Sequence, residues 1–514
     1  MFQERIDIMK QNILQYLEEC KKRFPNKTAF EDIKEKCTYS ELISDAEVIG
    51  SFIAKKTGLR TPIPIFMDKS VKAIKCFMGA VYAGCFYVML DPRQPAARLK
   101  HILNVLEAKI IVADEEYAEE IASLEFEGEV FYYTEVIQGQ RDSDVLKGIR
   151  SQVYDVDPLY SIFTSGSTGI PKGVVVSHRS VIDFIEHFTE IFDITDRDII
   201  GNQAPFDFDV SVKDIYSTLK AGATMQILPK QYFSIPMKLL DRLCEKGVTT
   251  IIWAVSAMCI ITTLKGFQYK IPYTLKKIMF SGEVMPIKHL NQWMDNIPDA
   301  MYVNLYGPTE ITCNCTYHVV DRRYEQGEVL PIGKPFPNEK VFLLDDKDKL
   351  IDKQGGIGEI CVSGTALSLG YYNNPEQTRK TFVQNPIHSK YMETIYRTGD
   401  LGFYNERGEL CFTSRKDFQI KHMGHRIELG EIELVMGKNE RIDRVCCIYD
   451  EKKNKILAFY VGDIEKKEII REISRELPGF MLPNVFIRIE NMPITKNGKI
   501  DRKALMYQYQ EGKR

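Results

Sequence analysis

The spacing of hydrophobic positions changes several times along this 514-residue chain. Up to about residue 150, stretches with apolar residues three or four positions apart alternate with short apolar runs, which predicts amphipathic helices between buried strands. The helical stretches are 45–56, 71–83 and 98–106, and the strand-like runs are 62–66, 110–113 and 130–133. This alternation predicts a layered α/β domain.

Similar alternation continues to about residue 340. The apolar runs 249–253, 277–280 and 301–305 are each followed by a loop and then by a helical pattern. Such runs are typical of parallel strands buried on both faces, whose carboxyl ends share one edge of the sheet. The loops at this edge are therefore predicted to carry a site.

Beyond residue 340 the pattern changes twice. Short strands separated by glycine turns occupy residues 340–413 and predict a small β-rich subdomain. After Asp417, strand-like runs at 444–449 and 456–461 and a helical stretch at 466–476 predict a compact α+β unit. We therefore expect a large multi-layer α/β domain over residues 1–416, made of two sheet-and-helix subdomains and the β-rich subdomain, followed by a small α+β domain over residues 417–514.

Composition and charge agree with a soluble protein that acts on a small molecule. Apolar residues make up 44% and charged residues 27% of the chain, as in ordinary globular proteins. The 68 basic and 71 acidic residues leave a net charge of −3, which gives no global attraction to nucleic acid or to an anionic membrane. The amino terminus lacks the features of a signal peptide and no apolar run approaches the ~18 residues of a membrane span, so we expect a cytoplasmic protein.

The twelve cysteines are mostly scattered singly. The close pairs Cys313/Cys315 and Cys446/Cys447 have no matching partner motif of the kind that binds zinc. We expect reduced, mostly packed thiols and neither a zinc site nor a disulfide framework.

The segment 161–173, SIFTSGSTGIPKG, has the composition of a phosphate-binding loop. Its glycines permit a close approach of the ligand, and its hydroxyl groups and one lysine can contact phosphate oxygens. These polar residues are Thr164, Ser165, Ser167, Thr168 and Lys172. The segment is not the GxxxxGK[ST] nucleoside triphosphatase loop, because no serine or threonine follows Lys172. A plain surface turn rich in serine and glycine is the alternative.

Four further motifs occur in order along the chain: NLYGPTE at 304–310, YRTGDLG at 396–402, SRKDFQIKHMGHRIELGEIE at 414–433 and PITKNGKIDR at 493–502. Together with TSGSTGIPKG they resemble the adenylate-forming superfamily, specifically the amino-acid-activating adenylation domains of nonribosomal peptide synthetases and the D-alanine–carrier-protein ligases. The resemblance covers nearly the whole chain, since weaker signatures recur at 38–42, 82–92, 208–212, 358–378 and 477–483.

The resemblance implies a two-step reaction with ATP and Mg²⁺ as cofactors. A substrate carboxylate attacks the α-phosphorus of ATP, which gives an acyl-adenylate and pyrophosphate, and the phosphopantetheine thiol of a carrier protein then takes the acyl group. Both steps depend on positioning and on charge neutralisation. No carrier segment follows Lys499 before the chain ends at Arg514, so we expect the carrier to be a separate chain.

The resemblance also assigns the nucleotide site. The residues it places around ATP are Thr164, Ser165, Ser167, Thr168, Lys172, Asn304, Leu305, Tyr306, Gly307, Pro308, Thr309, Asp400, Phe412, Arg415 and Lys499. Asp400 would accept both ribose hydroxyls, and Arg415 would support the ribose or the phosphates. Glu310, with Thr168, would hold magnesium, because a hard cation prefers oxygen ligands.

Three residues of the carboxyl-terminal domain are implied in catalysis. Lys499 would bridge the substrate carboxylate and the α-phosphate during adenylation, although a solvated tail lysine is the alternative. Asp417 lies at the position of the family hinge, about which this mobile domain would rotate to withdraw Lys499 and bring in Lys421 for thiolation. Ser414 stands where the family usually has glycine, which restricts the turn without removing a catalytic group.

The resemblance further assigns the amino acid pocket to Asp209, Val210, Lys213, Trp253, Met279, Ser281, Leu305, Cys313 and Asn314. Asp209 would pair with the α-ammonium group, which only an amino acid substrate carries. A helix-capping role for Asp209 is the alternative. Lys213 would either meet an acidic side chain or extend outward to solvent, and Trp253 would shorten the pocket.

These positions favour a small or medium polar L-amino acid, with acidic residues and D-alanine ranked behind. The alternative enzymes are a D-alanine–carrier-protein ligase of cell-wall modification and an acyl- or aryl-CoA ligase. A nucleotide-binding protein on the same fold is the alternative that is not an enzyme; the presence of Lys499, Asp400 and Glu310 argues against it.

Overall fold

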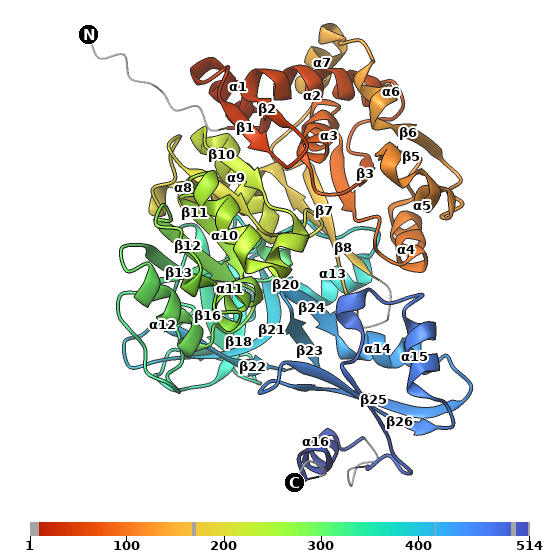
Figure 1. The fold of residues 1–514 in the computed structure, drawn as a ribbon, viewed down its shortest axis with the longest axis vertical. Helices are drawn as coiled ribbons and strands as arrows, with labels where there is room; N and C mark the ends of the chain where they lie inside the picture. Colours follow the sequence, from red (N-terminus) through yellow and green to blue (C-terminus); the bar gives the residue numbers. More distant parts are fainter. Residues whose placement is uncertain (1–9, 167–170, 417, 495–499, 512–514) are drawn as a thin grey trace.

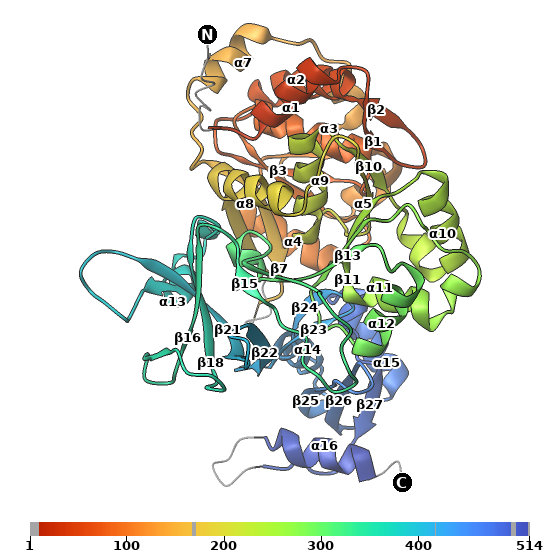
Figure 2. The same cartoon turned by 90° about the vertical axis from the view of Figure 1, so that its left-hand side faces the viewer.

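The computed structural model describes residues 10–166, 171–416, 418–494 and 500–511. Two large sheets form the upper part of the molecule, a smaller sheet lies beside them, and the carboxyl-terminal elements pack below (Figures 1 and 2). Asp417 lies outside the described residues.

The first large sheet has the strand order β19-β8-β7-β4-β3-β5-β6. Its strands are β3 (Pro62–Phe66), β4 (Phe86–Leu90), β5 (Ile110–Ala113), β6 (Glu129–Tyr132), β7 (Pro158–Thr164), β8 (Lys172–Ser177) and β19 (Gly370–Tyr371). The strands from β7 to β6 run parallel, whereas β8 and β19 are antiparallel additions. The phosphate-loop motif therefore connects the antiparallel pair β7 and β8.

The second large sheet has the order β15-β14-β13-β12-β11-β9-β10-β1-β2. Its strands are β1 (Thr28–Glu31), β2 (Lys36–Thr38), β9 (Ile199–Asn202), β10 (Thr224–Ile227), β11 (Thr250–Ala254), β12 (Lys277–Ser281), β13 (Met301–Tyr306), β14 (Thr316–Val319) and β15 (Lys334–Pro335). Strands β9 to β13 and β1 form its parallel part, as predicted for the buried apolar runs.

Helices cover both large sheets and fill the space between them. The helices before residue 300 are α1 (Leu14–Arg23), α2 (Tyr39–Ala54), α3 (Val71–Tyr82), α4 (Ala96–Leu106), α5 (Ala118–Ala122), α6 (Tyr133–Ile137), α7 (Ser143–Arg150), α8 (His178–Ile191), α9 (Val210–Ala221), α10 (Pro236–Glu245), α11 (Val255–Thr263) and α12 (Ile287–Asn296). Short 3-10 helices are η1 (Glu115–Tyr117), η2 (Lys230–Ser234), η3 (Gly266–Gln268) and η4 (Thr309–Ile311). The largest hydrophobic core joins residues of both sheets to α3, α8 and α9, so the two sheets share one packed interior.

The β-rich subdomain predicted after residue 340 is a six-stranded sheet with α13 (Pro375–Thr381) beside it. Its strands are β16 (Glu339–Leu344), β17 (Leu350–Ile351), β18 (Gly358–Gly364), β20 (Phe382–Gln384), β21 (Thr394–Tyr404) and β22 (Leu410–Arg415). Neighbouring strands in this sheet pair in the antiparallel sense.

The elements after residue 417 build two smaller sheets. The hairpin β23 (Gln419–His422) and β24 (His425–Glu428) faces the large domain, and β25 (Ile442–Asp450), β26 (Lys455–Gly462) and β27 (Val485–Arg488) form a separate three-stranded sheet. The helices are α14 (Leu429–Met436), α15 (Lys466–Ile473), η5 (Gly479–Met481) and α16 (Arg502–Glu511). Two hydrophobic clusters consist only of residues from this part of the chain.

This mixed architecture confirms the predicted fold class, whereas the division at residues 416 and 417 stays a prediction. Among the described residues, none of the helices combines the length and the apolar character that a membrane span requires. The described cysteines are free thiols, most of them buried, and no group of three potential metal-binding side chains occurs in this part of the chain.

Candidate active site

A cavity lies where the carboxyl ends of β7, β12 and β13 approach the β23–β24 hairpin. The large domain and the small domain both line it, so its walls come from segments far apart in the sequence. The lining residues used below are Thr164, Ser165, Asp207, Asp209, Val210, Ser281, Gly307, Pro308, Thr309, Cys313, Asn314, Asp400, Arg415, Lys421, His425, Arg426 and Phe480. The loops after two of the three predicted parallel strands, β12 and β13, meet at this cavity, whereas the segment after β11 does not line it.

The segment after β13 forms a tight wall of this cavity. A Cβ atom at Gly307 would lie 2.5 Å from the Cα of Asn314 and 2.7 Å from the carbonyl oxygen of Cys313. Only glycine therefore fits where the chain passes over the Cys313–Asn314 segment. This close approach brings Pro308 and Thr309 and the residues of the predicted amino acid pocket to one cavity.

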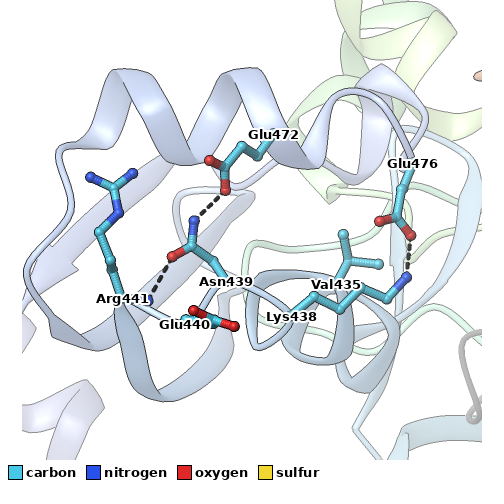
Figure 3. Close-up of a pocket in the computed structure, with 7 residues that line it drawn as sticks. All are labelled: Val435, Lys438, Asn439, Glu440, Arg441, Glu472 and Glu476. Atoms are coloured by element: carbon cyan, nitrogen blue, oxygen red, sulfur yellow. Dashed lines mark hydrogen bonds and ion pairs between the residues drawn. The ribbon is translucent and has the colours of Figure 1, made fainter.

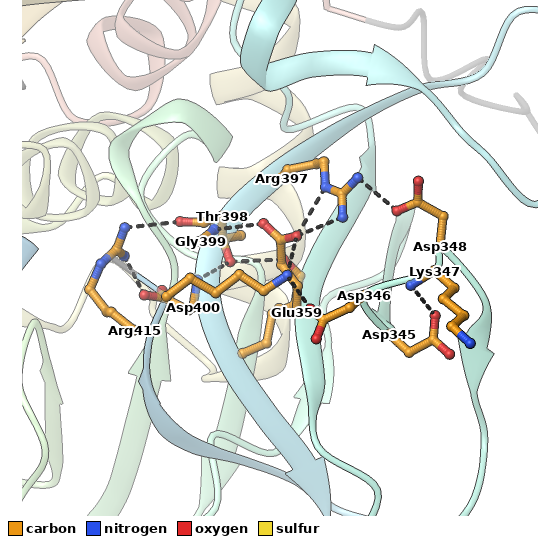
Figure 4. Close-up of polar contacts among 12 residues, drawn as sticks. Asp345, Asp346, Lys347, Asp348, Glu359, Arg397, Thr398, Gly399, Asp400 and Arg415 are labelled. Carbon is orange, nitrogen blue, oxygen red and sulfur yellow. Dashed lines mark hydrogen bonds and ion pairs between the residues drawn. The ribbon is translucent and has the colours of Figure 1, made fainter. Parts of the chain in front are cut away.

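Asp400 anchors one end of the cavity and is 2% exposed. The hydroxyl of Tyr306 donates to its Oδ2 at 2.6 Å, and Arg415 forms an ion pair with its Oδ1. Arg415 lies directly opposite Asp400 in the β21–β22 register and also donates to the carbonyl oxygen of Thr398 at 3.2 Å (Figure 4). Burial first, and the Asp400 charge second, raise the pKa of Tyr306 well above its usual value, so its hydroxyl stays a donor.

A second ionic network lies next to the backbone that carries Asp400. Glu359 on β18 pairs with Arg397 on β21 at 2.8 Å and accepts a hydrogen bond from the backbone N–H of Gly399 at 3.1 Å (Figure 4). Arg397 also pairs with Asp348 at 2.8 Å. These contacts fix the backbone next to Asp400, which orients its carboxylate.

Glu310 is completely buried beside the cavity. The hydroxyl of Tyr371 donates to its Oε1 at 2.7 Å, and Arg426 of the small domain pairs with its Oε2 at 2.7 Å. Burial is the largest single influence and raises the pKa of Glu310, but the Arg426 charge, the Tyr371 hydrogen bond and the Lys172 charge together outweigh it, so the pKa lies below its usual value. The carboxylate expected to bind magnesium is thus ionised and paired with a guanidinium group here.

The small domain also contacts the phosphate-loop motif. The hydroxyl of Ser165 donates to the carbonyl oxygen of Arg426 at 2.8 Å, and the backbone N–H of Gly166 donates to the carboxylate of Glu431. Glu431 in turn pairs with Arg98 at 2.9 Å, and both side chains are buried. Thr164 lines the cavity, and the ammonium group of Lys172 lies 5.5 Å from the ring centre of Tyr371. Ser167 and Thr168 lie outside the described residues.

Lys421 is the catalytic candidate that the structure places in the cavity. It lies on β23, and its ammonium group is 5.6 Å from the ring centre of Tyr306. Burial lowers its pKa, whereas Asp400 and Asp209 act against this shift. Lys499 and Asp417, the other two candidates, lie outside the described residues. Helix α16 lies at the far end of the small domain (Figures 1 and 2).

Two aromatic rings close the side of the cavity near the hairpin. His425 stacks on Phe480 with ring centres 3.7 Å apart and an angle of 4° between the ring planes. Burial lowers the pKa of His425 to about 4, so it is neutral at physiological pH. The hairpin is further held by the backbone N–H of Gly424, which donates to Glu283 at 2.9 Å.

Asp209 also lines the cavity, at the amino terminus of α9. It is 6% exposed and makes no capping hydrogen bond through its side chain, which contradicts the capping alternative. Burial raises its pKa, while a hydrogen bond with Thr309 and the charge of Lys213 act in the opposite direction. Its neighbour Asp207 also lines the cavity, but Gln94 donates to it at 2.7 Å. Asp209 is therefore the carboxylate of the two that has no amide bound to it and faces Thr309.

Lys213 and its neighbours lie near Asp209. Lys213 is completely buried, and its ammonium group donates to the Oδ1 of Asn314 at 2.6 Å. The alternative in which this lysine extends to solvent is therefore wrong. Val210, Ser281, Cys313 and Asn314 line the cavity, and Met279 and Leu305 are buried in the core next to them.

Trp253 does not belong to the pocket, which corrects the prediction. Its indole N–H donates to the carbonyl oxygen of Gly201 at 2.7 Å, and its ring packs on Phe233 with centres 5.1 Å apart. Successive residues of a strand point to opposite faces. Ile252 belongs to the core shared with Met279, whereas Trp253 belongs to the core on the other face.

Some residues assigned to the nucleotide lie near the cavity without lining it. The amide of Asn304 donates to the carbonyl oxygen of Pro331 at 2.8 Å, and Phe412 packs against the core around Tyr306. Conversely, sequence analysis gave no role to Arg426, Glu431 or Phe480. Arg426 and Glu431 lie inside the 414–433 motif, and Phe480 lies inside the signature at 477–483. Membership of these motifs was the sequence signal that could have found them.

A second hollow lies within the small domain, between the end of α14 and α15 (Figure 3). Lys438 pairs with Glu476, and Asn439 donates to Glu472 across it. Because these polar groups satisfy one another, the hollow is explained by packing within the domain.

Comparison with known proteins places this geometry in a family. Residues 17–372 match the model of the AMP-binding enzymes. Zwittermicin A synthase ZmaJ of Bacillus cereus is 32% identical over 502 residues, which cover 94% of this chain and 92% of that protein. Surfactin synthase subunit 1 of Bacillus subtilis (strain 168) is 32% identical over 499 residues, which cover 96% of this chain but only 14% of that protein. The chain spans less than half the length of several such relatives.

Solved structures show the same fold. The adenylation domain AlmE of Vibrio cholerae, in complex with glycyl-adenosine-5'-phosphate, superposes with a TM-score of 0.86 at 21% identity, covering 99% of both chains. NpsA-ThdA, an artificially fused adenylation-PCP di-domain from Klebsiella oxytoca, gives a TM-score of 0.82 at 19% identity, covering 94% of both chains.

Proposed function

Because the chain belongs to the AMP-binding enzyme family and is an adenylate-forming domain of the nonribosomal peptide synthetase type, we propose that it activates an amino acid with ATP. The substrate carboxylate attacks the α-phosphorus and displaces pyrophosphate, which gives an aminoacyl-adenylate. The phosphopantetheine thiol of a separate carrier protein then takes the aminoacyl group and releases AMP.

The observation that carries this proposal is that two buried carboxylates, Asp400 and Asp209, line one cavity. Asp400, oriented by Tyr306 and Arg415, suits the two hydroxyls of a ribose. Asp209, buried and without a capping bond, suits an ammonium group. A ligand that joins a nucleoside to an amino acid provides a partner for both carboxylates, and an aminoacyl-adenylate is such a ligand.

The cofactor assignment rests on the chemistry of the described side chains. Glu310 is an ionised, buried carboxylate, which fits a magnesium ion once Arg426 no longer pairs with it. Magnesium would shield the phosphate charges when bound. Thr164, Ser165 and Lys172 would hold the phosphates from β7 and β8, and Thr168 is proposed as a further magnesium ligand from its motif alone.

We assign the two steps to two placements of the small domain, with 1–416 and 417–514 as the domains and Asp417 as the hinge. Lys421 in the cavity supports the assignment of the described placement to thiolation. Lys499 would enter for adenylation. The carrier is supported by the structural similarity to an adenylation domain that was fused to a carrier domain.

The substrate is proposed to be an amino acid with a polar side chain, because Ser281, Cys313 and Asn314 line the cavity with Asp209. A D-alanine–carrier-protein ligase would need the same ammonium anchor, whereas the substrate of an acyl- or aryl-CoA ligase would bring no ammonium group to the buried Asp209 carboxylate. A cytoplasmic setting follows from the need for ATP.

Amino-acid-dependent exchange of pyrophosphate into ATP tests this function. Purified full-length protein should support exchange with at least one of the twenty L-amino acids or with D-alanine, and Asp209→Asn should weaken it. Exchange that occurs only with fatty or aryl acids would refute the amino acid assignment.

A further inference from the structure

A buried lysine lies directly behind the wall of the amino acid pocket. Lys213 is completely buried, and its ammonium group donates to the neutral amide oxygen of Asn314, 2.6 Å away. Among the residues that the structure describes, no carboxylate forms a direct ion pair with this ammonium group, although its charge acts to lower the pKa values of Asp209 and Asp214, which burial raises. A buried ammonium group is costly unless an anion accompanies it.

Lys213 lies on the same face of α9 as the proposed ammonium anchor. Asp209 precedes the helix and Lys213 follows four residues later, which is one turn or about 6 Å along the helix axis. A substrate whose α-ammonium group binds Asp209 therefore extends its side chain toward Lys213 and Asn314. Asn314 lines the cavity and Lys213 donates to it from behind, so a substrate side chain that reaches Asn314 comes close to the ammonium group.

The other charged groups around Lys213 have partners of their own. Asp214, the next residue, faces β9, where Asn202 donates to it at 2.7 Å, and Lys69 donates to that same Asn202 at 3.1 Å. Burial raises the pKa of Asp214 to about 7, so it supplies only part of a negative charge at neutral pH. Asp209 is neutralised when a substrate ammonium group binds.

The charges present when an amino acid is bound show which group would pair with Lys213. Asp209 and the α-ammonium group cancel, the α-carboxylate reacts at the nucleotide end, and Lys213 is left positive. A neutral side chain leaves the partly ionised Asp214 as the remaining counter-charge in a buried site. A side-chain carboxylate compensates the Lys213 charge and can also accept from the amide N–H groups of Asn314.

From this balance, and resting on the proposed amino acid activation, we propose that the enzyme selects an amino acid with a side-chain carboxylate through Lys213 and Asn314. This proposal reverses the ranking from sequence analysis, in which acidic residues stood behind small or medium polar ones. The reason is structural: the lysine does not reach solvent, and Trp253 does not shorten the pocket.

The test compares exchange rates for L-aspartate, L-glutamate, their amides L-asparagine and L-glutamine, and L-serine. The structure predicts that kcat/KM for one of the two acids exceeds that for its own amide by about tenfold or more, because hydrogen bonds between charged groups are stronger than neutral ones.

Two substitutions isolate the lysine charge. Lys213→Gln keeps donor groups near Asn314 without the charge and should shift the preference from the acid toward its amide. Asn314→Asp is nearly isosteric, supplies a carboxylate beside the ammonium group within the protein, and should likewise reduce exchange with the acid by about tenfold or more while retaining a neutral polar substrate. Lys220→Gln is the matched control on the same helix, since Lys220 pairs with Glu186 away from the pocket.

The outcomes separate this proposal from the function on which it rests. Exchange with an acidic amino acid that falls in Asn314→Asp and is unchanged in Lys220→Gln supports both the acidic substrate and amino acid activation. Exchange with a neutral amino acid and none with either acid overturns the proposal and leaves amino acid activation intact. Exchange with no amino acid overturns both. Melting curves identify a variant that does not fold, and if Lys213→Gln unfolds, Asn314→Asp and the wild-type substrate panel decide.

Discussion

The ion pair between Arg426 and Glu310 joins the small domain to the large one, and we predict that Arg426→Ala weakens this contact. Removing one partner leaves the Glu310 carboxylate completely buried with the Tyr371 hydroxyl as its described hydrogen-bond donor. Breaking a buried pair in this way costs about 3–5 kcal/mol. Because the Arg426 side chain is 13% exposed, we expect a free energy cost near the lower end of this range. That cost corresponds to roughly a hundredfold shift in the equilibrium between the docked and undocked small domain.

The pH dependence of this loss has a definite sign. In the wild type the pKa of Glu310 lies below its usual value, because Arg426, Tyr371 and Lys172 together outweigh burial. The stabilisation is therefore complete above the unfolded pKa and is lost as the pH falls through the folded one. Without Arg426, burial dominates and the pKa rises. Protonated Glu310 then needs no counter-charge, so the deficit of the variant should be largest near neutral pH and shrink toward about pH 4 to 5.

Two measurements check this reasoning. Hydrogen–deuterium exchange should report faster exchange of the β23–β24 amides in Arg426→Ala, and urea unfolding at neutral and acidic pH should give the free energy of unfolding. Arg471→Ala on the exposed side of the small domain is the control for general effects of losing an arginine. Equal deficits at both pH values, or unchanged exchange in the hairpin, would refute the assigned pair.

Three other substitutions probe separate parts of the account. Lys499→Ala should reduce pyrophosphate exchange by about a hundredfold or more, because it removes charge stabilisation of the transition state, while calorimetry shows nearly unchanged ATP binding; retained exchange would exclude the assigned role. Lys421→Ala should leave exchange near wild type and impair carrier loading measured by mass spectrometry, and equal damage to both steps would contradict two placements of the domain. Trp253→Phe should lower stability in urea by about 1 kcal/mol, because the Gly201 carbonyl loses its donor, with no change in amino acid preference; a changed preference would return Trp253 to the pocket.

Much of the fold could be predicted because the apolar spacing of buried elements is strong. The runs 62–66 and 110–113 coincide with β3 and β5, and 71–83 exceeds α3 by one residue. The helix expected at 45–56 instead begins at Tyr39, because Thr38 and Glu41 form a capping box. The T-x-x-E signature of that box is present in the sequence and was the available signal.

The site was predictable where a motif fixes both residue and role. Asp400 and Asp209 lie at one cavity although 190 residues separate them, which no local pattern shows. The orientation of Trp253 was not predictable, because a strand buried on both faces has no polar side to set its register. The burial of Lys213 likewise depends on how α9 packs against the Asn314 segment, which is a tertiary contact.

The central claim is that the substrate carboxylate attacks the α-phosphorus of ATP. An amino acid that supports exchange, labelled with oxygen-18 in its α-carboxylate, tests this most directly. One labelled oxygen should appear in the released AMP after the aminoacyl group is transferred or hydrolysed, because the bridging oxygen of the adenylate stays with phosphorus. Unlabelled AMP, or release of ADP with the label in inorganic phosphate, would contradict the account.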